Sequence, residues 1–262
     1  MGSLNIAATA MLAQQLNVDV IANNIANLNT TAFKRQRAEF NDLLYQSQVQ
    51  VGSTSSDSGT LVVSGAEFGT GVKVGSVYRI HEQGNMLSTS NNLDLAIQGK
   101  GYLQITMPDS TTAYTRAGSL QLSPGGTIVT PQGYTVQPGI TIPNDALEVS
   151  INASGEVLVK LPGQVNTSNV GQFQLANFPN EAGLQALGDN MLKETAASGN
   201  AVTGVPGASG FGSILQGFLE TSNVNMVNEI TTMISAQRAY ELASKVVQTS
   251  DEMLSSLVQT AG

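Results

Sequence analysis

The chain has 262 residues, enough for one or two buried cores, and only 11% of them are charged. Its formal net charge of −8 argues against nucleic acid as a partner, because phosphate binding requires a basic face. The absence of cysteine excludes disulfides and thiolate metal sites. No run approaches about 18 apolar residues, and the first residues lack a basic segment, so neither membrane insertion nor a cleaved secretory signal is predicted.

The first predicted element is a helix from Ser3, whose hydroxyl can cap it, to about Ala26. Apolar residues recur along it in seven-residue steps, and such a repeat buries a narrow seam against other helices. The seam residues predicted here are Leu4, Met11, Val18, Ile21, Ile25 and Leu28. The opposite face is rich in amides, including Asn24, which favours contact with further subunits over an exposed polar face.

A short connector, residues 31–66, is predicted after this helix. It carries two apolar residues, Phe33 and Phe40, around a basic cluster that is too short to indicate nucleic-acid binding. The candidate connector residues are Phe33, Lys34, Arg35, Arg37 and Phe40. Residues 46–64 are of low complexity and have too little apolar content to fold alone. They are either a disordered loop or a segment that orders only against neighbours.

From residue 69 to about residue 175 the apolar period changes to two, as in Leu103, Ile105 and Met107. Turn signals containing Gly, Pro, Asn or Asp separate the apolar runs. Many short strands at this spacing predict an antiparallel β-sandwich or a partly open barrel. Residues 196–213 are rich in Gly and Ser and predict a long loop that leads back to a helix.

The last predicted element is a long helix from Asn223 or Asn225 to about Gln259. It keeps the seven-residue apolar step of the first helix, and helices of this length without internal breakers are typical of assembly helices. The seam residues predicted here are Met226, Ile230, Met233, Tyr240, Val247, Leu254 and Leu257.

These elements predict an α+β protein in which long N- and C-terminal helices pair as a coiled-coil-like domain around a central, mainly antiparallel β domain. The expected divisions are a discontinuous helical domain of residues 1–30 and 223–262, the connector 31–66, and a β-rich domain 67–222. The terminal helices would pack on each other or on other copies, which favours an assembly subunit over an enzyme.

No catalytic constellation is recognisable, so the chain is predicted to be a non-enzyme without cofactor or metal. The single histidine, His81, is interpreted as solvated rather than catalytic. The glycine pairs at 69–71 and 99–101 complete neither a dinucleotide fingerprint nor a phosphate loop. Residues 207–210 miss the nucleophile-elbow pattern by one position.

The terminal segments also carry specific motifs, and these closely resemble the signatures of bacterial flagellar rod and hook subunits. The matching runs are IAATAMLAQQ at 6–15, VIANNIAN at 20–27 and NTTAFKR at 29–35, with GFLETSNVN at 217–225, MI at 233–234 and QRAYE at 237–241. The likeness extends through AYTRAGS at 113–119 and VQP at 136–138 and is strongest to subunits of the distal rod. One departure is Ala32, where that family usually has Gly; a positive φ there would strain Ala.

The resemblance implies a subunit that polymerises helically into a hollow drive shaft, the distal rod, and transmits torque from motor to hook. It implies export by the flagellar type III apparatus without a cleaved signal, and a position in the basal body across the periplasm. The implied partners are the chain itself, proximal rod proteins, the hook protein, a rod cap protein, and the peptidoglycan-ring and outer-membrane-ring proteins. The alternatives are another rod subunit, a hook protein, or a secreted β-rich binding module with oligomerising helical ends.

Overall fold

The computed structural model describes residues 2–49, 64–164 and 166–261; the side chains of Val49, Leu257 and Ala261 are not described. In chain order, the long helices α1 (Gly2–Ala26) and α2 (Met226–Ala261) come before and after a series of antiparallel strands, so the predicted α+β class is confirmed. Much of the low-complexity segment 46–64 lies outside the described residues. Within the described part, no helix is both long and apolar enough to cross a membrane.

The chain folds as two compact units that are built from discontinuous segments. The first comprises Met1–Ala26, Gln36–Tyr78 and Asn225–Gly262. The second comprises Asn27–Arg35 and Arg79–Val224.

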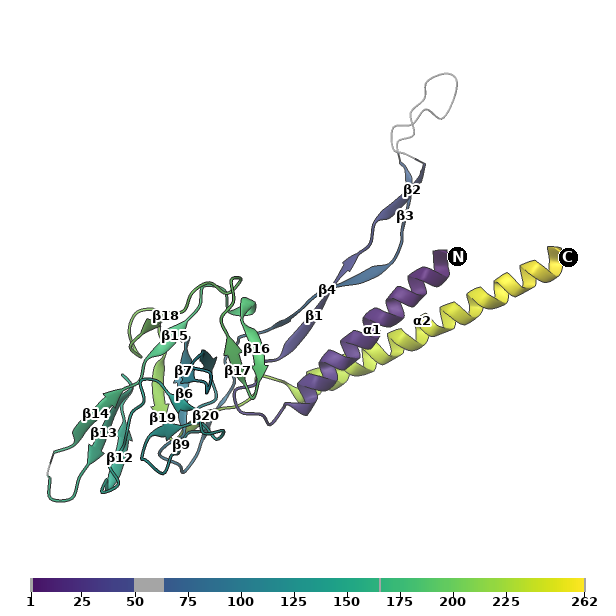
Figure 1. Ribbon diagram of the computed structural model, residues 1–262. Coiled ribbons are helices and arrows are strands. Elements are labelled where there is room, and N and C mark those ends of the chain that lie inside the picture. The colour runs from purple at the N-terminus through teal and green to yellow at the C-terminus, as the bar shows by residue number, and fades with distance from the viewer. Residues whose placement is uncertain (1, 50–63, 165, 262) are drawn as a thin grey trace. The chain divides into compact units, whose positions relative to one another are not determined.

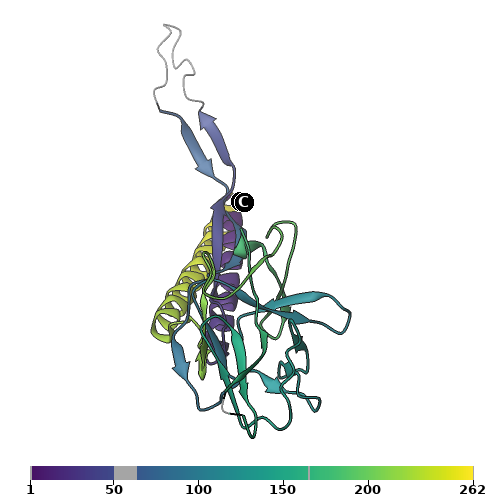
Figure 2. The same cartoon turned by 90° about the vertical axis from the view of Figure 1, so that its left-hand side faces the viewer.

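In the first unit, α1 and α2 lie side by side and run in opposite directions (Figures 1 and 2). The side chain of Asn24, near the end of α1, donates a hydrogen bond to Glu229 in the first turn of α2, at 3.1 Å. At the other end, the hydroxyls of Ser3 and Ser250 are 3.5 Å apart. The predicted boundaries of both helices agree with the structure to within a few residues.

A two-stranded ribbon completes the first unit (Figure 1). Strand β1 (Gln36–Asp42) pairs with β4 (Val72–Arg79), and the ribbon continues as the antiparallel pair β2 (Tyr45–Val49) and β3 (Ala66–Gly69). Beyond the end of β1, the amide of Leu43 donates to the carbonyl of Gly71 at 2.9 Å.

The second unit is built around a nine-stranded antiparallel sheet with the order β16-β17-β8-β7-β11-β10-β9, in which β15 pairs with both β7 and β18. Its strands are β7 (Tyr102–Thr106), β8 (Thr112–Thr115), β9 (Gln121–Leu122), β10 (Ile128–Val129), β11 (Thr135–Val136), β15 (Leu175–Asn177), β16 (Gln185–Gly188), β17 (Met191–Lys193) and β18 (Val202–Gly204). Strand β18 shows that the loop predicted over 196–213 contains a short strand.

Smaller antiparallel sheets accompany the large one. They are formed by β12 (Glu148–Ile151), β13 (Glu156–Lys160) and β14 (Ser168–Gln172), by β6 (Leu95–Gln98) with β19 (Ser213–Gln216), and by β5 (Met86–Ser88) with β20 (Phe218–Glu220). A 3-10 helix, η1 (Glu181–Gly183), follows β15. The main apolar core is formed by side chains of several of these strands and includes Leu95, Ile128, Val157 and Phe173, which are almost completely buried.

Four non-glycine residues at positive φ, Ala32, Ser110, Asp189 and Asn190, lie in connections of the second unit. Asp189 and Asn190, at φ 50° and 57°, form the turn between β16 and β17, as a two-residue hairpin loop requires. Ala32 has φ 57°, and its amide donates to the carbonyl of Glu220 at 2.8 Å. The positive φ that would strain Ala is therefore present at this position, where Gly would carry no steric penalty.

Candidate self-assembly surface

The structure separates the predicted seam residues of the first helix into three groups. Ile21 is buried, while Leu4, Met11, Val18 and Ile25 are half-buried on α1. Leu28 follows the end of α1 and belongs to the second unit, so it is not part of the helix face.

On α2 the predicted seam residues are more exposed. Met233 and Val247 are half-buried, whereas Met226, Ile230, Tyr240 and Leu254 expose 49%, 38%, 42% and 40% of their surface. The side chain of Leu257 lies outside the described part. The large apolar side chains of α2 are therefore only partly covered within one copy of the chain.

The buried positions of α2 follow a seven-residue step beside the predicted seam, and two of its residues, Ala236 and Ala243, flank that seam in the sequence. Glu229, Ala236 and Ser250 are buried, and Ala243, which keeps the same step, is half-buried. On α1, Ala7 is also buried. Small side chains at a repeating position let two helices approach closely, and this row of small residues was the available signal.

Further large apolar side chains on α2 are exposed outside the predicted seam. They are Val227, Ile234, Leu242, Val246, Met253 and Val258, with exposures from 46% to 74%. These exposed apolar side chains occur along the length of α2, which makes this helix a candidate interaction surface.

The predicted connector residues are divided between the two units, with Phe33, Lys34 and Arg35 in the second and Arg37 and Phe40 in the first. Phe33 is half-buried, and its carbonyl accepts the amide of Asn223 at 3.4 Å. The amide of Arg35 donates to the side chain of Asn223 at 2.7 Å. Arg37 is exposed and Phe40 is half-buried, both on β1 in the first unit.

Lys34 is part of a buried charge cluster that sequence reasoning missed. Its ammonium donates to Glu220 Oε1 at 2.6 Å, and Arg116 Nε donates to Glu220 Oε2 at 2.8 Å. The Glu220 side chain is completely buried. Arg116 also donates to the carbonyls of Ile97, Gly99 and Gly101, and Lys34 to that of Glu82.

The two cations keep the Glu220 carboxylate charged. Burial alone would raise the pKa of Glu220, but the charges of Arg116 and Lys34 outweigh it and hold that pKa below its ordinary value. Because both carboxylate oxygens and the donors are paired, the cluster is a structural junction. It joins residues that are far apart in the sequence.

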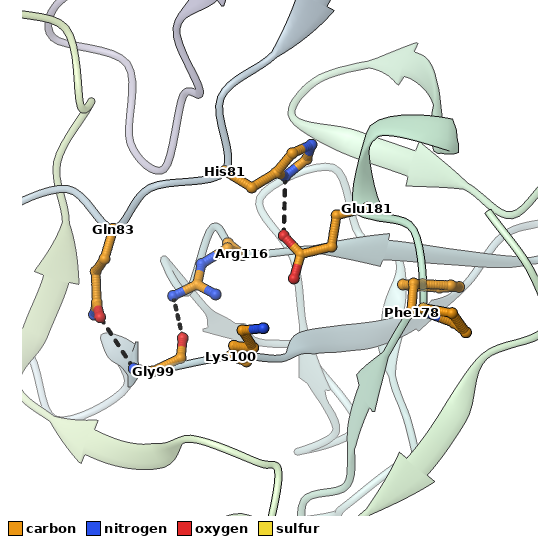
Figure 3. A pocket seen from close by; sticks show the side chains of 8 residues that line it. His81, Gln83, Gly99, Lys100, Arg116, Phe178 and Glu181 are labelled. Atoms are coloured by element: carbon orange, nitrogen blue, oxygen red, sulfur yellow. Dashed lines mark hydrogen bonds and ion pairs between the residues drawn. The ribbon is translucent and has the colours of Figure 1, made fainter.

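A polar pocket of about 380 Å³ lies beside this cluster (Figure 3). His81 and Glu181 point toward one another across it, with Nδ1 and Oε2 3.6 Å apart. The Tyr102 hydroxyl lies 2.8 Å from His81 Nδ1 and 3.2 Å from Glu181 Oε2. The His81 side chain is only 11% exposed, so the interpretation of a solvated histidine is wrong.

Burial lowers the pKa of His81, although the carboxylate of Glu181 opposes this effect. Burial also raises the pKa of Tyr102. Nδ1 of a neutral imidazole can accept a hydrogen bond from the Tyr102 hydroxyl. This contact is a common structural hydrogen bond and does not indicate catalysis. No group of three or more potential metal-ligating side chains occurs in the described residues.

Comparisons with known proteins agree with these features. Residues 4–34 match the family described as flagella basal body rod protein, and residues 215–260 match the flagellar basal body rod FlgEFG protein C-terminal family. Residues 96–159 match the flagellar hook protein FlgE/F/G D1 domain. A flagellar basal-body rod protein FlgG of Caulobacter vibrioides is 58% identical over 99% of both chains.

The chain belongs to the FlgG family of flagellar basal-body rod proteins. FlgG of Agrobacterium fabrum is 49% identical over 97% of both chains, and FlgG of Bacillus subtilis is 40% identical over 98% of this chain and 97% of that one. The predicted family is thus confirmed. This membership identifies the chain as a structural subunit of the flagellar basal-body rod.

Proposed function

We propose that this chain builds the distal rod by helical polymerisation through its terminal helices. The resulting hollow shaft would cross the periplasm and transmit torque to the hook. The observation that carries the proposal is the exposed apolar surface along α2, which at 36 residues is about 54 Å long. An isolated copy leaves this surface in water, whereas neighbouring copies can cover it.

The energetic gain comes from burial rather than from ion pairs. Fully covering a large aliphatic side chain contributes about 1.5–3 kcal/mol, and in the described part of α2 four such side chains are more than half exposed, namely Val227, Leu242, Met253 and Val258. The predicted seam on α2 would then pack in a coiled-coil-like manner against helices of other copies, while the row of small residues faces α1 in the same copy.

Torque transmission requires packing and no chemical step, so we infer a non-enzymatic role. The expected partners are other copies of this chain, proximal rod proteins, the hook protein, a rod cap protein and the two ring proteins. The flagellar type III export apparatus would deliver the subunit without a cleaved signal.

The proposal is tested by placing one charge on the exposed apolar face. Leu254→Asp should prevent polymerisation, because burying an unpaired carboxylate opposes packing. Gln248→Asp is the matched control, since it adds the same charge at an exposed polar position of the same helix. Assembly of the purified proteins would be followed by sedimentation and electron cryo-microscopy.

Straight hollow tubes from the wild type and the control, but not from Leu254→Asp, would support the proposal. Normal tubes from Leu254→Asp would show that Leu254 does not lie in the assembly contact. A wild-type protein that never polymerises would contradict self-assembly. Curved tubes would favour a hook protein. A discrete small oligomer would favour the binding module.

A further inference from the structure

Asn24 of α1 joins three elements through one buried amide. It is 1% exposed, although it lies on the helix face that the sequence suggested for contact with other subunits. Its Nδ2 donates to the carbonyl of Gln36 at 2.8 Å, and its Oδ1 accepts the amide of Gln36 at 2.8 Å. Two residues of adjacent antiparallel strands exchange hydrogen bonds in the same way. Asn24 therefore takes the place of a strand neighbour at the start of β1.

The same amide also reaches α2. A second Nδ2 proton of Asn24 is donated to Glu229 Oε2 at 3.1 Å, and Glu229 is itself buried. An asparagine amide has two donor protons and one acceptor oxygen, and here both protons and the oxygen form hydrogen bonds at the same time. Its attachment to β1 is thus linked to the presence of α2.

Thr9 provides a second attachment nearer the start of α1. Its hydroxyl accepts the amide of Val72, the first residue of β4, at 3.3 Å, and donates to the carbonyl of Ile6 at 2.8 Å. The close approach depends on Gly71, at φ 132°, because a Cβ there would collide with the Thr9 hydroxyl. Thr9 and Asn24 are 15 positions apart, which is about 22 Å along the helix.

The geometry points to Thr9 and Asn24 as the positioning residues that fix the β1/β4 ribbon on α1, with Asn24 making this attachment depend on the pairing of α1 with α2. Two attachments at opposite ends of the paired strands prevent the ribbon from pivoting about either one. A chain whose terminal helices separate loses the Glu229 contact and with it a firm hold on β1. Helix pairing and ribbon position are therefore coupled.

Hydrogen–deuterium exchange of the purified full chain tests this coupling. Asn24→Ala should raise exchange of the amides in β1 and β4 by about tenfold or more, because the attachment is lost. Exchange within α1 and α2 should rise less. Gln15→Ala removes an exposed amide from the same helix and should leave the ribbon unchanged. The amides of β7 and β8, in the other unit, serve as the internal reference.

Two further variants separate positioning from general destabilisation. Thr9→Val keeps the side-chain shape but removes the Val72 contact, so exchange should rise at the start of β4 only. Asn24→Asp replaces the donor amide by a carboxyl group beside Glu229, so at neutral pH ribbon protection should fall at least as far as in Asn24→Ala.

The inference is overturned if the ribbon of Asn24→Ala is as protected as that of the wild type, or if helices and ribbon lose protection equally. Should the dispersed wild-type chain leave α1 and α2 unprotected, the ribbon must be unprotected too, and a protected ribbon would overturn the coupling. These measurements use unpolymerised protein, so their failure leaves the proposed rod assembly untouched.

Discussion

At the residue scale, the Glu220 carboxylate and its two cations place buried charges inside the second unit, where desolvation costs free energy. A completely buried carboxylate is tolerated only because Lys34 and Arg116 both donate to it. The sequence offered no way to find this cluster, because its three members are separated by 82 and 104 positions and none belongs to a periodic pattern. Lys34 was noted only as part of a short basic run.

Glu220→Gln should destabilise the second unit by about 3–5 kcal/mol, since it leaves two buried cations without a counter-charge. Urea unfolding followed by tyrosine fluorescence, to which Tyr102 and Tyr114 contribute, would measure the change. Glu82→Gln is the control, because its side chain is exposed and only its main chain meets Lys34. A loss below about 1 kcal/mol in Glu220→Gln would show that the cluster contributes little.

His81 should give the second unit an acid-dependent stability. Burial lowers its pKa in the folded state, while an unfolded histidine titrates at about 6.5. The free energy of unfolding is thus unaffected by His81 above about pH 6.5, and it decreases as the pH falls from there toward the pKa of His81 in the folded state. His81→Gln should remove the dependence between about pH 7 and 5 in thermal melts. An unchanged pH profile in the variant would place its origin elsewhere.

At the scale of elements, periodicity predicted both helices and their limits, because a seven-residue step over several turns is a local signal. Periodicity finds an apolar helix face but not the neighbour that covers it. The predicted seam, which includes Met233 and Tyr240, therefore stays a prediction, while Ala236 and Ser250 are the positions of α2 that are buried within one chain. Asn24 shows the same limit: its partners, Gln36 and Glu229, could not be read from its own helix.

The close approach of α1 and α2 should depend on Ala236, which is 3% exposed. Ala236→Leu adds volume to a packed contact and should destabilise the helix pair by about 1–3 kcal/mol. Circular dichroism at 222 nm during heating would detect earlier loss of helix. Gln237→Leu, at an exposed neighbouring position, should melt like the wild type. Equal melting of both variants would mean that small residues do not limit the contact.

At the scale of the whole molecule, the sequence predicted the fold class and many short strands, but not their order. Alternation within a strand is local, whereas pairing is not: Leu103 of β7 pairs with Leu175 of β15, 72 positions later. The family likeness added what periodicity could not, namely the kind of assembly to expect. The proposed domain limits remain a prediction.

Assembly of a chain with so few charges should respond to temperature more than to salt. Because apolar burial weakens on cooling, warming from about 10 to 30 °C should lower the critical concentration for polymerisation. Raising NaCl from about 0.05 to 0.5 M should lower it only modestly, by screening the net charge of −8. Sedimentation at each temperature and salt concentration measures the critical concentration. Strong inhibition by salt would instead indicate that ion pairs hold the copies together.

The buried charge cluster also limits how the sequence can change over generations. Losing Glu220 leaves two buried cations without a counter-charge, and losing either cation leaves one carboxylate oxygen of Glu220 without its charged donor, so single exchanges should be selected against. Replacing all three by apolar residues of similar volume would remove the buried charges together, but it needs several simultaneous substitutions. Among related sequences these positions should therefore be retained together or replaced together, and seldom one at a time.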